Sequence, residues 1–238
     1  MEEIRLNKYL ADHGIASRRE ADRLIENGLV TVNGVKAAPG QKVSDADRIE
    51  VNGKTAPCKA PEKVVLALYK PRGVVSTTRR FKGETNVVDL VGYPERVYPV
   101  GRLDKDSEGL LLLTNDGTLM KEVTTAGRHE KEYEVTVNKE LTAHFLSRME
   151  KGVFLAELDR STMETKVVKT GKKSFRIILR EGLNREIRRM CGTLGYTVVE
   201  LKRIRIMNVT LDGLKSGEYR KITGKEKETL YAMAKLRP

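Results

Sequence analysis

The apolar positions in the first 55 residues repeat with the spacing of two short helices and then of short strands. Residues 4–10 carry a helical stripe. Ser17 and Glu20 have the S-x-x-E spacing of a capping box, which predicts a second helix that stops at Asn27-Gly28. The stretch LVTVNGVK then alternates apolar with polar residues around an Asn-Gly pair, and RIEVNGK repeats this pattern. The order helix, helix, short strands predicts one small domain.

A composition change separates this domain from the rest of the chain. Residues 55–63, TAPCKAPEK, contain two prolines and two lysines and little apolar surface, as expected of a linker. We therefore place a boundary at residue 60, between a first domain of residues 1–60 and a second domain of residues 61–238.

Strand-like and helix-like stretches alternate irregularly in the second domain. Apolar or alternating runs predict strands at 64–69, 98–103, 110–114, 133–137 and 174–179. Helical spacing predicts helices near 116–125, 140–150, 184–194 and 224–236. This irregular order predicts an α+β fold around a mixed or antiparallel sheet.

Composition and charge narrow the class of protein. The 238 residues are 39% hydrophobic and 33% charged, which is usual for a globular protein. No apolar run approaches the roughly 18–20 residues that span a bilayer, and MEEIRLNKYL lacks the apolar stretch of a signal peptide. We expect a cytoplasmic protein without membrane contact. Its net charge of +12 favours a polyanionic partner, although solubility alone would also explain it.

The two cysteines do not indicate a metal site. Cys58 and Cys191 have no ligand spacing to each other or to the three histidines. We interpret both as buried or incidental thiols.

The richest candidate chemistry lies in GRLDKDSEGLLLLTNDG, residues 101–117. Asp104, Asp106 and Glu108 stand at alternate positions and would share one face of an extended strand, as a Mg²⁺ site requires. In a second interpretation two of them form an acid/base pair, as in glycoside hydrolysis. In a third, all three are solvent-exposed residues of a loop without a catalytic role. In a fourth interpretation Asp104 acts alone, and an arginine guanidinium that binds it in a fixed geometry keeps it ionised.

Further candidates have ordinary structural explanations beside the functional ones. Arg18, Arg19 and Arg23 surround the start of the second helix, where they would bind phosphate or form a solvated face. Tyr133 begins an alternating strand and would normally be half-buried packing. A helix that starts near residue 184 carries three arginines beside an apolar stripe, and they would form a solvated basic face: Arg185, Arg188 and Arg189.

Four stretches in order resemble the motifs of one enzyme family: KPRGVVSTT (70–78), the 101–117 segment, HEKEYEVTV (129–137) and GLNREIRRMCGTLGY (182–196). Together with KRIRIMNVTLDGL (202–214) they are similar to pseudouridine synthases of the RsuA/RluB/RluE/RluF group. Residues 5–53 resemble an S4 RNA-binding domain, through LNKYLADHGIASRREADRLIENGLVTVNG. The resemblance covers nearly the whole chain.

The resemblance implies roles for single residues. It makes Asp104 the carboxylate that detaches uracil from its ribose, by attack on the sugar or as a base at C2′, and it leaves Asp106 and Glu108 in a loop. Tyr133 becomes the aromatic residue that stacks on the target base and helps its proton transfer. Arg188 becomes the partner of Asp104. Contacts to RNA fall to the remaining basic residues of these motifs, Arg102, Lys131, Arg185 and Arg189, with Arg18, Arg19 and Arg23 in the S4-like domain.

The resemblance also implies a substrate and excludes a cofactor. We expect a ribosomal RNA substrate, 23S before 16S or tRNA, that presents a flipped or unpaired uridine. We expect no metal, no organic or nucleotide cofactor, and a monomer. The alternative is a non-catalytic S4-type RNA-binding or ribosome-assembly protein, which would not need Asp104, Tyr133 and Arg188 together.

Overall fold

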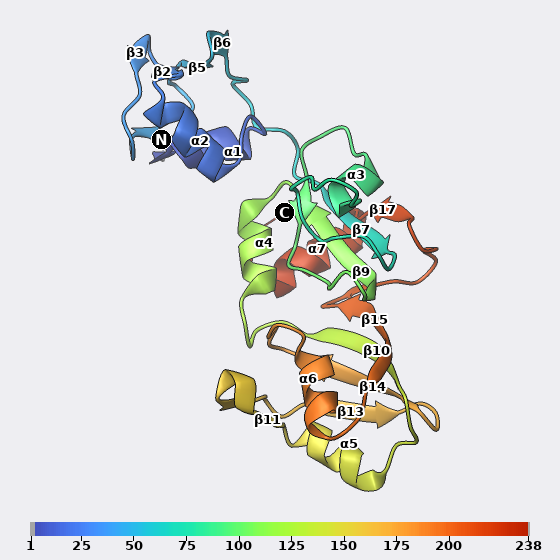
Figure 1. The fold of residues 1–238 in the computed structure, drawn as a ribbon. Coiled ribbons are helices and arrows are strands. Elements are labelled where there is room, and N and C mark those ends of the chain that lie inside the picture. The colour runs from blue at the N-terminus through green and yellow to red at the C-terminus, as the bar shows by residue number, and fades with distance from the viewer. Residues whose placement is uncertain (1–2, 238) are drawn as a thin grey trace. The chain divides into compact units, whose positions relative to one another are not determined.

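A computed structural model describes residues 3–237, and it divides the chain into two compact units (Figure 1). The first unit runs to Lys63 and also includes Pro94–Arg96 and Asn115–Gly117. The second contains Val64–Tyr93, Val97–Thr114 and the chain from Thr118 onward.

The first unit has two helices and short antiparallel strands. Its elements are β1 (Ile4–Arg5), α1 (Leu6–Asp12), α2 (Arg18–Glu26), β2 (Val30–Val32), β3 (Val35–Lys36), β4 (Lys42–Val43), β5 (Ile49–Val51) and β6 (Lys54–Thr55). The sheet order is β3-β2-β5-β6, and β1 pairs with β4.

The capping box and the Asn-Gly turn predicted for this unit are both present in the structure. Ser17 accepts a hydrogen bond from the backbone N–H of Glu20, whose side chain accepts one from Ser17 N–H, so the capping box begins α2. Asn33 and Gly34 both have positive φ, as the tight turn between β2 and β3 requires. The predicted helix, helix, strands order is therefore confirmed.

The second unit is built on one large sheet. Its strands are β7 (Val65–Lys70), β8 (Tyr98–Pro99), β9 (Glu108–Thr114), β10 (Lys131–Val137), β11 (Phe154–Leu155), β12 (Arg160–Ser161), β13 (Lys166–Lys169), β14 (Ser174–Leu179), β15 (Val198–Ile206), β16 (Val209–Thr210) and β17 (Tyr219–Lys221). Its helices are α3 (Val87–Val91), α4 (Gly117–Thr124), α5 (Ala143–Glu150), the 3-10 turn Ala156–Leu158, α6 (Glu186–Thr193) and α7 (Gly224–Met233).

The sheet is mixed, as predicted for an α+β fold. The main order is β13-β14-β10-β15-β9-β7-β17, in which β15 and β9 are parallel and the other neighbours antiparallel. The parallel pair joins two antiparallel halves of the sheet.

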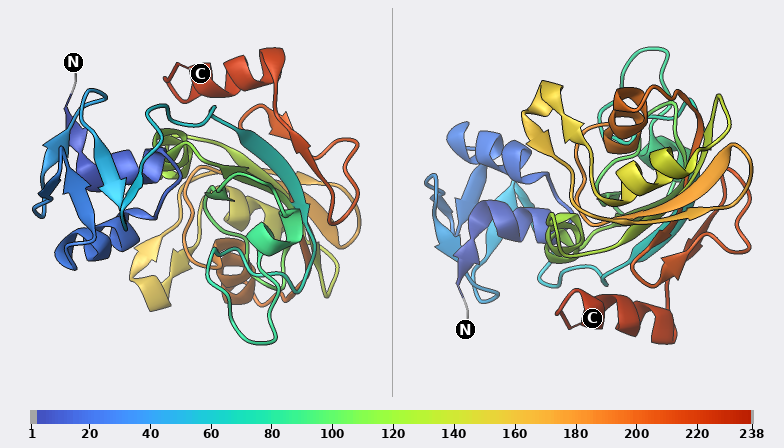
Figure 2. Two further views of the ribbon diagram at one scale, coloured as in Figure 1. Left: turned by 90° about the horizontal axis from the view of Figure 1, so that it is seen from above. Right: turned by 90° about the horizontal axis from the view of Figure 1, so that it is seen from below.

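The leucine run of β9 is buried on both faces of the sheet. Leu110 and Leu112 pack with α4 and α7, whereas Leu111 and Leu113 pack with α3. Figure 2 shows α7 on one side of the curved sheet and α3, α5 and α6 on the other. Each leucine buried in this way contributes about 1.5–3 kcal/mol, so β9 is a rigid base for the residues that precede it.

Several predicted boundaries are wrong for identifiable reasons. The strand expected at 98–103 stops at Pro99: Val100 N–H still donates to Leu112 O of β9 (2.8 Å), but Gly101 has φ +73° and Leu103 bonds to the Ser76 hydroxyl instead of to the sheet. Glu108, expected in the loop, is the first residue of β9. The long strand β15 and the short helix α3 were not predicted. Of the two cysteines, Cys191 is buried and Cys58 is exposed.

Among the described residues, no helix has both the length and the apolar character needed to cross a membrane.

Candidate active site

A cavity of about 510 Å³ opens in the second unit. Its walls come from the loop after β7, the 101–107 segment, β10, the segment before α6, and β15. Five of the residues that the sequence selected line it: Arg102, Asp104, Lys131, Tyr133 and Arg185. The fold thus brings together side chains from motifs that are distant in the chain, among them Ser76 and Arg203.

Asp104 stands in the irregular connection between β8 and β9, and its backbone is fixed on both sides. The Ser76 hydroxyl donates to Leu103 O (2.7 Å) and accepts from Leu103 N–H (3.1 Å). Ser107 N–H donates to Asp104 O (3.1 Å), closing a turn. The buried Leu103 side chain anchors the segment in the core around α3. The Asp104 carboxylate, 29% exposed, is therefore presented to the cavity from a braced turn.

Arg185 is the arginine that reaches Asp104. Its Nη1 lies 3.5 Å from Asp104 Oδ2 and 3.3 Å from Asp106 Oδ1. Arg185 caps α6 with φ +54°, in the left-handed region, so its side chain leaves the helix axis toward the 104–106 turn. The contact to Asp104 is long for an ion pair, and the Asp104 carboxylate remains accessible to a ligand.

The expected pair of Arg188 with Asp104 is not the contact found. Arg188 is the third residue of α6, and its side chain, 14% exposed, faces the backbone of the 104–107 turn. Its Nη2 lies 3.3 Å from Asp106 Oδ2 and donates to Asp106 O and Ser107 Oγ (3.4 Å each), while Nη1 donates to Val198 O (3.1 Å). Arg188 thus ties α6 and β15 to the turn that carries Asp104.

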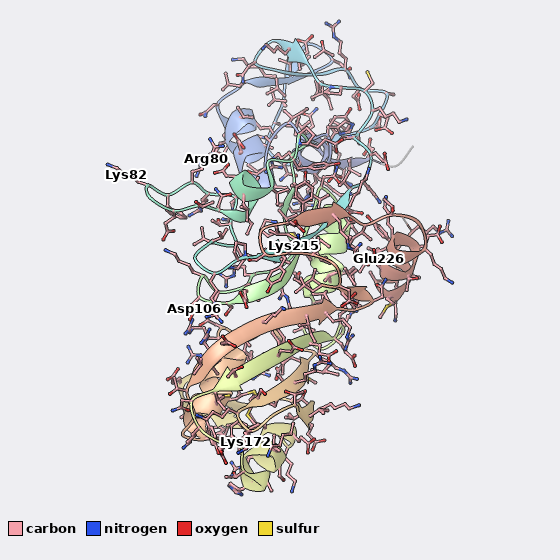
Figure 3. All side chains as sticks on the ribbon, turned by 90° about the vertical axis from the view of Figure 1, so that its right-hand side faces the viewer. Arg80, Lys82, Asp106, Lys172, Lys215 and Glu226 are labelled. Atoms are coloured by element: carbon pink, nitrogen blue, oxygen red, sulfur yellow. The ribbon has the colours of Figure 1, made fainter. Side chains whose placement is uncertain are left out.

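The two arginines act electrostatically on Asp106. Burial raises the pKa of this carboxyl, but the hydrogen bond from Arg185 and the charges of Arg188 and Arg185 outweigh burial and lower the pKa overall. Asp106 remains exposed on the outer side of the turn, where Figure 3 labels it. Of the two aspartates in this turn, Asp104 therefore lines the cavity, whereas Asp106 pairs with both arginines.

A buried lysine lies beneath this turn. Lys70, the last residue of β7, donates from Nζ to the carbonyl oxygens of Pro71 and Val74 (2.8 Å each). Burial lowers its pKa to about 8, against the carboxylates of Asp106 and Asp104, which raise it. The positive end of Lys70 thus helps to keep negative charge on the turn above it.

Tyr133 lies on β10 and contacts the cores around α3 and around α5 and α6. Its ring is 6.0 Å from the Arg203 guanidinium carbon, and Arg203 donates from Nε to Leu110 O (2.7 Å). Lys131, two residues before it, lines the same cavity, and burial and the charge of Arg203 lower the pKa of Lys131. A flat ring and buried cations therefore lie on the wall of the cavity, beside Asp104.

A carboxyl pair closes the cavity near α6. Glu186 is buried, accepts from Leu183 N–H (3.0 Å), and lies beside the carboxyl of Glu181. Burial raises the pKa of Glu186 to about 7, and the neighbouring Glu181 raises it further against the backbone hydrogen bond. Glu186 is thus a neutral hydrogen-bonding group below pH 7.

The other predicted basic residues have mixed surroundings. Arg102 is exposed and lines the cavity, and it lies in the loop between β8 and β9 and not in the predicted strand. Arg189 donates to Asn184 O (2.9 Å) and forms an ion pair with Glu157. Three arginines of α2 are exposed: Arg18 and Arg19 begin the helix, whereas Arg23 lies in its last turn and not at its start as predicted.

The acidic residues do not assemble as a metal site. Within residues 3–237, no group of three or more His, Cys, Asp or Glu side chains is arranged to hold a metal ion.

Sequence reasoning missed four residues of the site: Lys70, Ser76, Glu186 and Arg203. Lys70 carried a signal, since it ends an apolar strand run directly before Pro-Arg-Gly. Ser76, Glu186 and Arg203 lie within the motifs that carry the family resemblance, but no hydrophobic pattern or turn signal distinguishes them from their neighbours.

Comparison with known proteins gives consistent matches over both units. Residues 64–193 match the profile of the family described as RNA pseudouridylate synthase, and residues 4–49 match the S4 domain. The chain is 48% identical to the dual-specificity RNA pseudouridine synthase RluF of Escherichia coli K12, over 97% of this chain and 79% of RluF. It is 39% identical to the ribosomal large subunit pseudouridine synthase B of Bacillus subtilis, over 97% and 96%. A crystal structure of a pseudouridylate synthase superposes with a TM-score of 0.71 at 28% identity, covering 95% of this chain and 99% of that one.

Proposed function

The chain belongs to the RNA pseudouridylate synthase family and carries an S4 domain, and from this premise we propose that it converts a uridine of ribosomal RNA to pseudouridine with Asp104 as its essential carboxylate. The observation that carries the proposal is the braced, half-exposed Asp104 carboxylate in a cavity that Tyr133 also lines.

The reaction breaks one bond to the ribose and makes another. The N1–C1′ bond of uridine breaks, the released uracil rotates within the cavity, and C5 bonds to C1′. The proton on C5 then leaves to solvent while N1 gains one, so no atom is lost and no oxidant or reductant is consumed. Asp104 starts the sequence either by attack on C1′ or by removing a proton from C2′, and both routes require the carboxylate form.

The surrounding residues support this chemistry. Arg185 supplies the counter-charge to Asp104, and Arg188 acts as a positioning residue that holds the 104–107 turn. Tyr133 stacks on the freed base and offers a hydroxyl for proton exchange at C5. Lys131 and Arg203 place positive charge beside a base that carries negative charge once its glycosidic bond is broken.

The choice of RNA follows from the named relatives. One is described as a dual-specificity RNA enzyme and another as a large-subunit enzyme, so we place 23S rRNA first, with tRNA or 16S rRNA as further substrates. Such a substrate agrees with the cytoplasmic location that the sequence led us to expect.

We assign phosphate binding and contact with the target nucleotide to different parts of the chain, with the boundary near residue 60. The first part binds phosphates through Arg18, Arg19 and Arg23. The second part contacts the target nucleotide through Arg102, Lys131, Arg185 and Arg189.

Release of tritium from C5 tests the proposal without knowledge of the modified position. Transcripts of 23S rRNA, 16S rRNA and tRNA made with [5-³H]uridine are incubated with the purified protein, in buffer with and without EDTA. We expect release from the 23S transcript, equal in both buffers. Binding of all three RNAs with no release from any would favour the non-catalytic RNA-binding or ribosome-assembly protein instead.

A further inference from the structure

We propose that Phe81 is a stacking platform for a nucleobase next to the target uridine in the bound RNA strand. The inference rests on the proposed function, because it assumes that the ligand of the Asp104 cavity is RNA.

Phe81 lies at the cavity but outside the core. Its side chain is 52% exposed and lines the same cavity as Asp104 and Tyr133. Within the described part of the chain it belongs to none of the four hydrophobic clusters. A large apolar ring at the entrance of a polar site is thus open to a ligand.

The loop that carries Phe81 is braced, so the ring has a defined place. Arg80 grips Asp89 of α3 with Nε and Nη2 (2.9–3.2 Å). Glu84 N–H donates to Phe81 O (3.2 Å), and the Glu84 carboxylate pairs with Lys105 at 2.8 Å. Since Lys105 follows Asp104 directly, this ion pair links the Phe81 loop to the turn of the proposed catalytic residue.

The neighbours of Phe81 in the chain are cationic. Arg79, Arg80 and Lys82 are exposed on either side of it. Figure 3 shows Arg80 and Lys82 on the loop that protrudes from the second unit, toward the same side of the picture as Asp106. An aromatic ring set among cations is the arrangement that binds single-stranded RNA, because the cations hold phosphates while the ring stacks on a base.

The chemistry at the cavity favours a base over an apolar protein segment. A uridine that enters the cavity must leave its own stack, and its neighbours in the strand are then unstacked as well. A phenylalanine face beside the entrance replaces part of the stacking that they lose. The charged residues around Phe81 would be costly to cover with an apolar partner.

Substitution of Phe81 separates stacking from simple apolar contact. Single-turnover tritium release from a [5-³H]uridine 23S transcript, at increasing enzyme excess, gives the half-saturating enzyme concentration. Phe81→Ala and Phe81→Leu should raise it on the order of tenfold, and Phe81→Trp should keep it within about twofold. The slope of log affinity against log salt should stay unchanged in all three, since no charge is removed.

Phe154→Ala is the matched control. Phe154 has the same 52% exposure, but it lies on β11 and does not line the cavity. It should leave the half-saturating concentration unchanged, and thermal melting followed by circular dichroism identifies any variant that fails to fold.

The outcomes distinguish the inference from the proposed function. If Phe81→Leu behaves like wild type, or Phe81→Ala changes affinity no more than Phe154→Ala, Phe81 does not stack on RNA, whatever Asp104 does. If wild type releases no tritium, the proposed function fails, and filter binding of the same transcript to the same variants decides whether Phe81 stacks on RNA.

Discussion

At the scale of single residues, the 104–107 turn divides its acids between two tasks. Asp104 accepts one long contact from Arg185, whereas Asp106 engages both Arg185 and Arg188. Ser76 and Arg188 hold the backbone on either side. The Asp104 carboxylate is thus positioned by the chain around it more than by its own ion pair.

The two arginines of α6 should respond differently to substitution by lysine. Arg188 makes four contacts through a planar fork, so Arg188→Lys should lower the single-turnover rate nearly as much as Arg188→Ala. Arg185 supplies mainly charge at 3.3–3.5 Å, so Arg185→Lys should recover much of the rate that Arg185→Ala loses. Rates at saturating enzyme measure this, and efficient rescue at Arg188 with none at Arg185 would reverse the two roles.

Glu186 predicts a pH-dependent stability. Burial raises the pKa of Glu186 in the folded state to about 7, above its value in the unfolded chain. At pH values between these two pKa values, the folded state therefore binds more protons at this residue than the unfolded state does. The contribution of this residue to stability is therefore full below the unfolded pKa and is lost as pH rises through about 7. Glu186→Gln, which is neutral at every pH, should gain on the order of 2 kcal/mol relative to wild type between pH 5 and pH 8.5. Urea unfolding at both pH values measures the difference, and an equal difference at the two would contradict it.

At the scale of elements, the parallel contact of β9 with β15 joins the halves of the second unit's sheet. Gly109 of β9 faces Arg203 of β15, with φ +111°. A Cβ at Gly109 would lie 2.3 Å from Arg203 O. Only glycine permits this approach, which also sets the position of Arg203 behind Tyr133.

Gly109→Ala should therefore destabilise the protein by about 2 kcal/mol or more, since it adds backbone strain to a clash with rigid backbone. Gly192→Ala is the control, because Gly192 lies within α6, where an added Cβ meets nothing within 4 Å. It should keep or slightly raise stability in urea unfolding. Equal losses in both variants would show that the β9–β15 contact tolerates a side chain.

The same elements show which parts of the fold could be predicted from the sequence and which could not. The capping box of α2, the Asn-Gly turns and the leucine run of β9 are local signals, and each predicted its element. β15 was missed although the end of its VVELKRIRI alternates charged with apolar residues, the pattern that predicted other strands; its pairing with β9 and β10 is decided by distant partners. The family resemblance implied Arg188 of α6 as the partner of Asp104, whereas the contact in the structure is made by Arg185. The left-handed backbone of Arg185 is visible only in the structure.

At the scale of the whole molecule, the net charge of +12 lies in the second compact unit, because the first unit carries 12 Lys and Arg against 12 Asp and Glu. If the first unit grips phosphates, Arg18→Glu with Arg19→Glu should weaken RNA binding and make log affinity less steeply dependent on log salt. Lys42→Glu with Lys54→Glu changes the charge equally on exposed strand residues of the same unit. Filter binding over a salt series should show a clearly larger effect for the arginine pair, and equal effects would mean that net charge alone attracts RNA.

Two isosteric substitutions test whether Asp104 is the essential carboxylate of the proposed reaction. Single-turnover tritium release from the 23S transcript should be abolished in Asp104→Asn, with RNA binding retained. Asp106→Asn, two residues away in the same turn, should lose no more than about tenfold. Release by Asp104→Asn at a rate near wild type would contradict the account.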